Sequence, residues 1–174
     1  MKRIWYAVYT KPQSERKVAA LLQKKKIESF CPHNRVITGY GSKKKMVYQP
    51  LFPTFVFVYI TEIEMSEVRR TSDVINFVYW LGKPAMIKTP EIENIAHFNG
   101  LYCNIKVERS PVNSVGMVHI TNEPGPRTVS GFINSKTTKI KLTLPSLGFT
   151  MFAETENVAP AVAEFQPQVS EALI

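Results

Sequence analysis

One segment limits the folds open to this chain more than any other. Residues 54–60 read TFVFVYI, a continuous run of apolar, strand-forming residues. A strand of this kind is buried on both faces, so helices or other strands must cover each side of it. Because side chains alternate along a strand, Phe55 and Phe57 point to one face, and the valines that follow each of them point to the other. Residues 4–9 are equally apolar on both faces and are expected to form a strand central in its sheet.

Helices are expected to supply part of that cover. Residues 13–26 carry apolar side chains at helical spacing and basic side chains on the opposite side, which predicts an amphipathic, basic helix. Residues 62–71 can form a second, short helix. The sequence Thr89-Pro90-Glu91 is typical of a helix start, because proline fits the first helical position and an acid is favourable at the positive end of the dipole. Gly100 is expected to end that helix.

Further strands are predicted around the helices. They cover residues 28–37, residues 46–48 and residues 74–81. The turn signal at residues 39–42 joins the first two into a long hairpin whose tip is positive. The order strand, helix, strand, hairpin, strand, helix, strand predicts an α+β fold with helices packed on a mostly antiparallel sheet.

The chain changes character after residue 103. Residues 104–114 are polar and contain proline, which is typical of a linker, and short strands follow it. Ile140, Leu142 and Leu144 alternate with polar residues, which predicts one buried and one solvated face. The predicted strands span residues 117–121, 131–134, 138–144 and 150–153. The expected organisation is a first domain over 1–103, a linker over 104–114, a small all-β barrel over 115–158 and a flexible tail over 159–174.

Positive charge is concentrated in the first third of the chain. The first 60 residues contain 12 Lys and Arg against two acids, a net charge of +10, whereas the whole chain carries +8. The usual partner of such a surface is a polyanion, either nucleic acid or an anionic membrane surface. A membrane span is not expected, because the longest uncharged apolar run, residues 46–60, is too short and contains two prolines. No export signal is visible, so a cytoplasmic location is expected.

Catalytic and metal-binding patterns have little support in the sequence. Asp73 is the single aspartate of the chain, so the sequence gives little support to catalysis by a pair of carboxylates. No nucleophile elbow or P-loop is present. Cys31 and Cys103 cannot form a disulfide framework or a CxxC motif. His33 lies two residues after Cys31, but the other histidines lack ligand spacing, so ordinary packing is favoured over a zinc site. We therefore expect no enzymatic activity, no metal and no cofactor.

Three stretches of the sequence resemble a known family. WYAVYTKPQSERKVAALLQ, PLFPTFVFV and VINFVYWLGKPAMI, in this order of elements, resemble the N-terminal (NGN) domain of the NusG family of transcription elongation factors over residues 3–100. The likeness is greatest to the specialised paralogues RfaH and, above all, the UpxY antiterminators. VGMVHITNEPGPRTVSGFI and LGFTMFAETENV resemble the start and end of the family's KOW motif, which forms an SH3-like barrel. The usual Gly-Pro-Phe turn is replaced here by residues 122–126.

The resemblance implies a function without enzymatic activity. Such a factor docks on the clamp helices of RNA polymerase and suppresses pausing and termination, and UpxY proteins act on surface-polysaccharide operons. In relatives the barrel recruits Rho or a ribosomal protein, and in RfaH it refolds into a helical hairpin. The alternating residues 138–144 prefer strand, so we predict the barrel state without switching, in a monomeric protein.

By position, the resemblance also implies contact residues. The polymerase-binding residues would be Tyr9, Phe52, Phe57, Trp80 and Leu81, with Ser66 near a second contact to the gate loop of the other large subunit. Lys11, Lys17 and Arg35 would lie near the non-template DNA strand, with Lys43, Lys44 and Lys45 nearby. From its place on the basic hairpin, Tyr40 is either a stacking platform for an exposed base or a residue that packs the turn.

Other interpretations of the same residues remain open. Lys43–Lys45 can also be a charged tip that prevents edge pairing, and the lysines at 24–26 fit a solvated helix end. Without the resemblance, the phenylalanines would be read as core. The alternative function is an RNA-binding translation or ribosome-associated protein, because an SH3-like barrel beside a basic domain suits ribosomal RNA equally. A small metal-dependent nuclease is a third reading.

Overall fold

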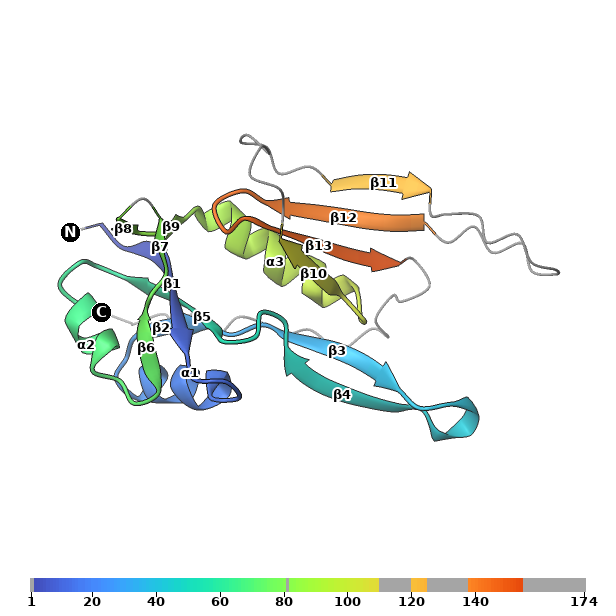
Figure 1. The fold of residues 1–174 in the computed structure, drawn as a ribbon, viewed down its shortest axis with the longest axis horizontal. Helices are drawn as coiled ribbons and strands as arrows, with labels where there is room; N and C mark the ends of the chain where they lie inside the picture. Colours follow the sequence, from blue (N-terminus) through green and yellow to red (C-terminus); the bar gives the residue numbers. More distant parts are fainter. Residues whose placement is uncertain (1, 81, 110–119, 125–137, 155–174) are drawn as a thin grey trace, which may run out of the picture.

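The computed structural model describes residues 2–80, 82–109, 120–124 and 138–154. Its main sheet has five strands in the order β2-β5-β1-β6, with β9 also paired to β1 (Figure 1). All pairings are antiparallel, and the longest, between β1 and β5, runs from Ile4 opposite Ile60 to Tyr9 opposite Phe55. The predicted α+β fold with an antiparallel sheet is therefore confirmed, and β1 is central as expected.

The first part of the chain contains β1 (Ile4–Thr10), α1 (Glu15–Lys24), β2 (Glu28–Phe30), β3 (His33–Thr38), the 3-10 turn η1 (Gly41–Lys43), β4 (Lys45–Pro50), β5 (Phe55–Ile60), α2 (Met65–Arg69), β6 (Val74–Phe77), β7 (Tyr79–Trp80), β8 (Lys83–Pro84), β9 (Met86–Ile87) and α3 (Thr89–Leu101). The second part contains β10 (Lys106–Arg109), β11 (Ile120–Pro124), β12 (Thr138–Leu144) and β13 (Phe149–Glu154).

Each face of the main sheet has its own apolar cluster. Val56 and Val58 of β5 lie in a cluster with Val18 and Leu22 of α1 and with Val68 of α2. Phe57, on the opposite face, lies in a cluster with Ile95 and Phe98 of α3. The alternation predicted for residues 54–60 is confirmed, and helices cover both sides of the sheet, as a strand apolar on both faces requires.

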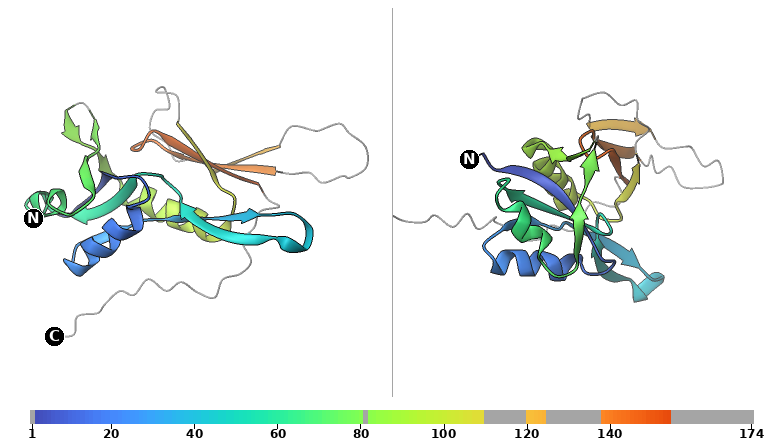
Figure 2. Two further views of the ribbon diagram at one scale, coloured as in Figure 1. Left: turned by 60° about the horizontal axis from the view of Figure 1, so that its bottom comes forward. Right: turned by 60° about the vertical axis from the view of Figure 1, so that its left-hand side comes forward.

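A second antiparallel sheet, in the order β10-β13-β12-β11, packs on the same cluster as α3 (Figures 1 and 2). Ile140, Leu142 and Leu144 of β12 are buried there, as their alternation predicted. Part of the predicted linker is a strand. Its residues Lys106–Arg109 form β10, which pairs with β13. The predicted strand 131–134 and the tail lie outside the described residues, so the closed barrel stays a prediction.

One polar contact between α3 and the C-terminal sheet is made by Glu91, in the first turn of the helix. Its carboxylate is buried and accepts hydrogen bonds from the backbone N–H of Ser146, at 3.2 Å from Oε2, and from the Ser146 hydroxyl, at 2.6 Å from Oε1. Ser146 lies in the turn between β12 and β13. The C-terminal sheet is therefore held to α3 by apolar packing and by a hydrogen-bonded carboxylate.

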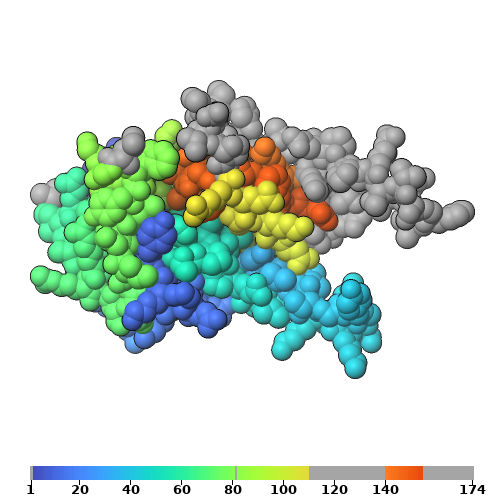
Figure 3. Space-filling model, in the orientation of Figure 1, coloured from blue at the N-terminus to red at the C-terminus, as the bar shows by residue number. Residues whose placement is uncertain are grey.

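The hairpin β3–β4 forms a separate two-stranded sheet, paired from His33 opposite Pro50 to Thr38 opposite Lys45. Asn34 anchors it, because its side chain donates to the carbonyl of Ile105 at 2.7 Å and accepts from the N–H of Ile105 at 3.1 Å. These are the two bonds a neighbouring strand would make. The far end of the hairpin protrudes from the molecule (Figure 3).

Several predicted boundaries were wrong. The helices expected over residues 13–26 and 62–71 span only Glu15–Lys24 and Met65–Arg69. The strand expected over residues 28–37 is two strands, because the chain turns at Pro32, whose ring offers no N–H to a ladder. β2 pairs with β5 and β3 with β4. The strand expected over 74–81 breaks into β6 and β7. Helix α3 continues past Gly100 to Leu101, where the side chain of Arg35 binds carbonyls of the last turn.

Among the described residues, no helix combines the length and the apolar character needed to cross a bilayer.

Candidate functional site

Aromatic side chains form a connected cluster at the end of β1 and the start of β5. The ring centroids of Tyr9 and Phe55 are 4.8 Å apart, and those of Phe52 and Phe57 are 5.5 Å apart. Phe149 of β13 joins the two pairs, at 5.7 Å from Phe52 and 5.9 Å from Phe55. The structure thus brings together three of the residues predicted to bind polymerase, namely Tyr9, Phe52 and Phe57.

The C-terminal sheet covers most of this cluster. Phe52 is 3% exposed and Phe57 is 1% exposed, whereas Tyr9, at the edge, is 37% exposed. The prediction treated these phenylalanines as part of a surface that stays open until a partner covers it. In the structure the cover comes from the same chain: Phe149 contacts Phe52, and α3 packs in the same cluster as Phe57.

Two other predicted polymerase contacts, Trp80 and Ser66, lie on elements outside the aromatic cluster. Trp80 is on the small β7–β8 hairpin and is 64% exposed, and its neighbour Tyr79 accepts a hydrogen bond at its hydroxyl from Arg69, at 2.6 Å. Leu81 lies outside the described residues. Ser66 is exposed on α2, and its hydroxyl donates to the carbonyl of Ile63 at 3.4 Å. Among the described residues, Trp80 has no ring contact with Phe52, whose ring neighbours are Phe57 and Phe149.

Lys11 and Lys17 meet at the carboxylate of Asp73. Lys17 Nζ lies 2.6 Å from Oδ2 and Lys11 Nζ lies 3.1 Å from Oδ1. The hydrogen bonds from Lys17 and then from Lys11 hold the pKa of the Asp73 carboxyl below its ordinary value of 3.8. Both predicted nucleic-acid contacts are thus already paired with an acid. In the sequence, Asp73 stands out only as the chain's single aspartate, and no local pattern links it to Lys17, which lies 56 positions earlier.

The tip of the hairpin carries three more of the predicted cations. Lys43, Lys44 and Lys45 are exposed, and Tyr40 is 97% exposed. A residue so open does not pack the turn, which decides between the two interpretations of Tyr40 in favour of a free ring. The tip offers charge and an aromatic face in one place.

Arg35 lies away from this exposed surface. It is 8% exposed, and its guanidinium donates to the carbonyls of Asn99, Gly100 and Tyr102, at 2.8 Å for Gly100 and 3.2 Å for Tyr102. The last turn of a helix leaves carbonyls without intrahelical partners, and Arg35 supplies donors to them. We therefore leave Arg35 out of the proposed nucleic-acid surface.

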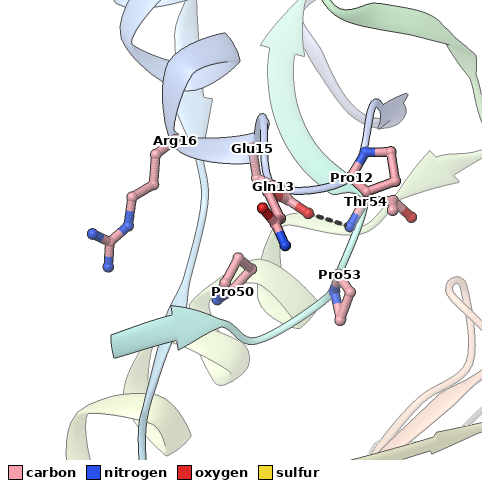
Figure 4. A pocket seen from close by; sticks show the side chains of 7 residues that line it. All are labelled: Pro12, Gln13, Glu15, Arg16, Pro50, Pro53 and Thr54. Atoms are coloured by element: carbon pink, nitrogen blue, oxygen red, sulfur yellow. Dashed lines mark hydrogen bonds between the residues drawn. The ribbon is translucent and has the colours of Figure 1, made fainter. Parts of the chain in front are cut away.

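A pocket of about 290 Å³ opens between the start of α1 and the β4–β5 connection (Figure 4). Sequence reasoning missed it, because its two walls come from segments far apart in the chain. Glu15, which is buried, accepts a hydrogen bond from the N–H of Thr54 at 2.7 Å. This bond holds Thr54 at a φ of 66°, a conformation that is rare for a β-branched residue. The lining residues are Pro12, Gln13, Glu15, Arg16, Pro50, Pro53 and Thr54.

His33, at the base of the hairpin, accepts a hydrogen bond from Arg16, with Arg16 Nε at 2.7 Å from His33 Nε2. Burial, and then the positive charge of Arg16, lower the pKa of His33 from its ordinary value of 6.5. The structure therefore requires neutral His33, because a protonated ring cannot accept this bond.

This lowered pKa predicts a pH dependence of stability. Below pH 6.5 the unfolded chain binds a proton at His33 that the folded protein resists, so the free energy of unfolding should fall as the pH drops through 6.5 toward the folded pKa. Urea unfolding followed by circular dichroism between pH 5 and 8 measures this. His33→Gln is the control, and an equal slope in that variant over this range would contradict the assignment.

A family model described as transcription termination factor NusG matches residues 3–96. The chain belongs to the NusG family. The matched region contains β1, α1, the hairpin, β5 and most of α3, and so every member of the aromatic cluster except Phe149. NusG proteins are transcription factors and not enzymes.

Many solved structures resemble the chain, and two of them illustrate the likeness. NusG of Thermotoga maritima, from a structure that concerns domain interaction, has 19% sequence identity and a TM-score of 0.49, with 92% of this chain and 95% of that chain covered. The MjSpt4:Spt5 complex, conformation A, has 16% identity and a TM-score of 0.35, with 90% and 96% covered. No curated protein sequence matches the chain.

Proposed function

We propose that this protein is a transcription elongation and antitermination factor of the NusG family. It binds the clamp helices of RNA polymerase, contacts the non-template DNA strand, and thereby suppresses pausing and termination. The proposed target is a surface-polysaccharide operon, as in the UpxY proteins that the sequence resembles. In the same proposal, Ser66 lies toward the gate loop, and the C-terminal barrel recruits Rho or a ribosomal protein.

The observation that carries the proposal is the position of the aromatic cluster beside a cationic surface in a NusG-family domain. Tyr9 and Lys11 lie two residues apart at the end of β1, so the apolar and the positive surfaces adjoin. A partner that presents an apolar helix tip next to a nucleic acid would meet both surfaces at once. An elongating polymerase presents such a pair.

The cover over the cluster adds a condition to the proposal. Phe52 is buried against Phe149, and Phe57 is buried in the same cluster, so clamp helices can reach Phe52 only when the C-terminal sheet has moved away. Tyr9 remains partly open and is the side chain that a partner would meet first. Displacement of the sheet would also free it for the recruitment step.

The nucleic-acid contact is assigned to the hairpin tip together with Lys11 and Lys17. Lysine–phosphate contacts provide affinity that falls with salt, and stacking of a base on a free aromatic ring contributes about 1–3 kcal/mol whatever the base. Tyr40 and Lys43–Lys45 supply both kinds of contact on a protruding tip (Figure 3). An exposed single strand suits this arrangement better than a closed duplex.

The test is read-through of a terminator in a transcription reaction with purified polymerase. The protein should increase read-through, and simultaneous Lys43→Gln, Lys44→Gln and Lys45→Gln changes should remove most of this gain. The same triple variant should flatten the salt dependence of single-stranded DNA binding by about 2 units of slope, because about 0.7 is lost per phosphate contact. Lys2→Gln with Lys24→Gln and Lys26→Gln is the control, since it removes equal charge elsewhere.

A pulldown from lysate tests the partner directly. Recovery of the polymerase β′ subunit is the expected result. Recovery of ribosomal RNA without polymerase would replace the proposal with the RNA-binding, ribosome-associated alternative.

A further inference from the structure

Asp73 occupies the position between the two lysines of the proposed nucleic-acid surface. Each oxygen of its carboxylate receives one ammonium group, from Lys17 at 2.6 Å and from Lys11 at 3.1 Å. The lysine side chains are 63% and 65% exposed, whereas the Asp73 side chain is 11% exposed. The ammonium groups thus remain open to an incoming ligand, and the carboxylate is withdrawn from solvent.

The backbone places this carboxylate. Asp73 has a φ of 67°, in the left-handed region that aspartate and asparagine tolerate better than most residues. Its carbonyl accepts a hydrogen bond from the N–H of Lys11 at 2.9 Å, and the next residue, Val74, is paired with Thr10. Because the junction of β1 and β6 fixes the residue, the carboxylate stands at one defined place beside Lys11.

The arrangement has the chemistry of an occupied anion site. An ionised carboxylate that accepts two charge-assisted hydrogen bonds presents the same pair of anionic oxygens as a phosphodiester. An ion pair whose lysines remain this exposed contributes little to stability, so a purely structural role does not explain why two lysines meet at Asp73. A phosphate that reached the two ammonium groups would have to replace Asp73.

We propose that Lys11 and Lys17 form a binding site for one phosphate group of a single-stranded nucleic acid, and that Asp73 fills this site until such a strand displaces it. The inference rests on the proposed function and explains how the protein would distinguish its nucleic acid from other polyanions. A polyanion that offers only phosphates binds more weakly, because displacing Asp73 reduces its net binding free energy. A strand that also stacks on Tyr40 and meets the hairpin tip recovers that loss, so Asp73 suppresses non-specific binding.

The experiment compares Asp73→Asn with Glu28→Gln in the full chain. Asparagine tolerates the same φ, and both changes raise the net charge by one, but Glu28 is an exposed residue of β2 with no lysine on its carboxylate in the described structure. The probe is a fluorescein-labelled single-stranded DNA of about 12 nucleotides, followed by anisotropy over a KCl series. Asp73→Asn should bind about fivefold more tightly at low salt, with a slope steeper by about 0.7, and Glu28→Gln should change binding less than twofold.

The outcomes separate this inference from the proposed function. Adding Lys11→Gln and Lys17→Gln to Asp73→Asn should abolish the gain. If Asp73→Asn binds no more tightly than Glu28→Gln, or more weakly than the unchanged protein, the inference is overturned, although the lysine surface stands as long as Lys11→Gln with Lys17→Gln weakens binding. If that lysine pair has no effect on binding, both the contact and the inference fail.

Discussion

Arg35→Ala is expected to lower the free energy of unfolding by about 2–4 kcal/mol, although sequence position placed this residue beside DNA. The guanidinium is buried and donates to three carbonyls, those of Asn99, Gly100 and Tyr102. Truncation leaves these acceptors of the last α3 turn without their donor, in a place that water reaches poorly. Urea unfolding of the full chain measures the loss.

Two further variants test whether the buried hydrogen bonds of Arg35 cause this loss of stability. Arg3→Ala is the matched control, because Arg3 makes an exposed pair with Glu64 at 3.3 Å and should cost less than about 1 kcal/mol. Arg35→Lys should recover part of the loss, because all three bonds come from the single nitrogen Nη2, and an ammonium group also carries three N–H donors on one nitrogen. Unchanged stability together with weaker DNA binding would instead return Arg35 to the nucleic-acid surface.

Phe149→Ala is expected to release the C-terminal sheet from the aromatic cluster. The side chain contacts Phe52 and Phe55, and loss of a packed phenylalanine typically costs about 3 kcal/mol. A loss of that size corresponds to a weakening of the docked arrangement by roughly 100-fold. Hydrogen exchange of the β5 and α3 amides should rise, and the affinity for purified RNA polymerase should rise with it.

The same strand offers a control of equal chemistry. Phe152 lies on β13 but belongs to the opposite face from Met151 and Ala153, which are buried toward α3. Phe152→Ala should leave exchange in β5 and polymerase affinity unchanged. If both phenylalanine variants raised polymerase binding equally, a general loosening of the sheet would explain the effect, and the cover by Phe149 would not.

Glu91→Ala should act in the same direction through the polar contact. It removes the acceptor of the Ser146 N–H and hydroxyl, and because Ser146 is only partly buried the loss should lie near the lower end of the about 1–3 kcal/mol typical of an unpaired buried donor. The exposed Glu93, two residues further along α3, is the control. Additive effects of Glu91→Ala and Phe149→Ala on exchange are not expected, because both sites belong to one interface.

Local patterns predicted the parts of the fold that depend on neighbouring residues. The alternation in residues 54–60 placed Phe57 and Val58 on opposite faces of the sheet, and the structure has them in different clusters. The alternation in residues 138–144 placed Ile140, Leu142 and Leu144 on a buried face. Burial patterns of this kind repeat every second residue and need no knowledge of the partner element.

Such local patterns could not predict which partners the charged side chains contact. Arg35 looked like one more cation of the basic hairpin, and only the fold brings the end of α3, more than 60 positions later, against its guanidinium. Asp73 likewise reaches Lys17 across 56 positions. A long polar side chain has no periodic signature, so its partner depends on which segments the sheet order brings together.

From the sequence alone came the antiparallel α+β fold, the central place of β1, the strand character of residues 138–144 and the gathering of positive charge in the first 60 residues. Only the tertiary structure decided that Phe149 covers Phe52 and that Asp73 lies between Lys11 and Lys17. The reason is physical. Side-chain alternation and helical spacing are properties of a few consecutive residues, whereas these contacts exist only after strands and helices distant in the chain have packed together.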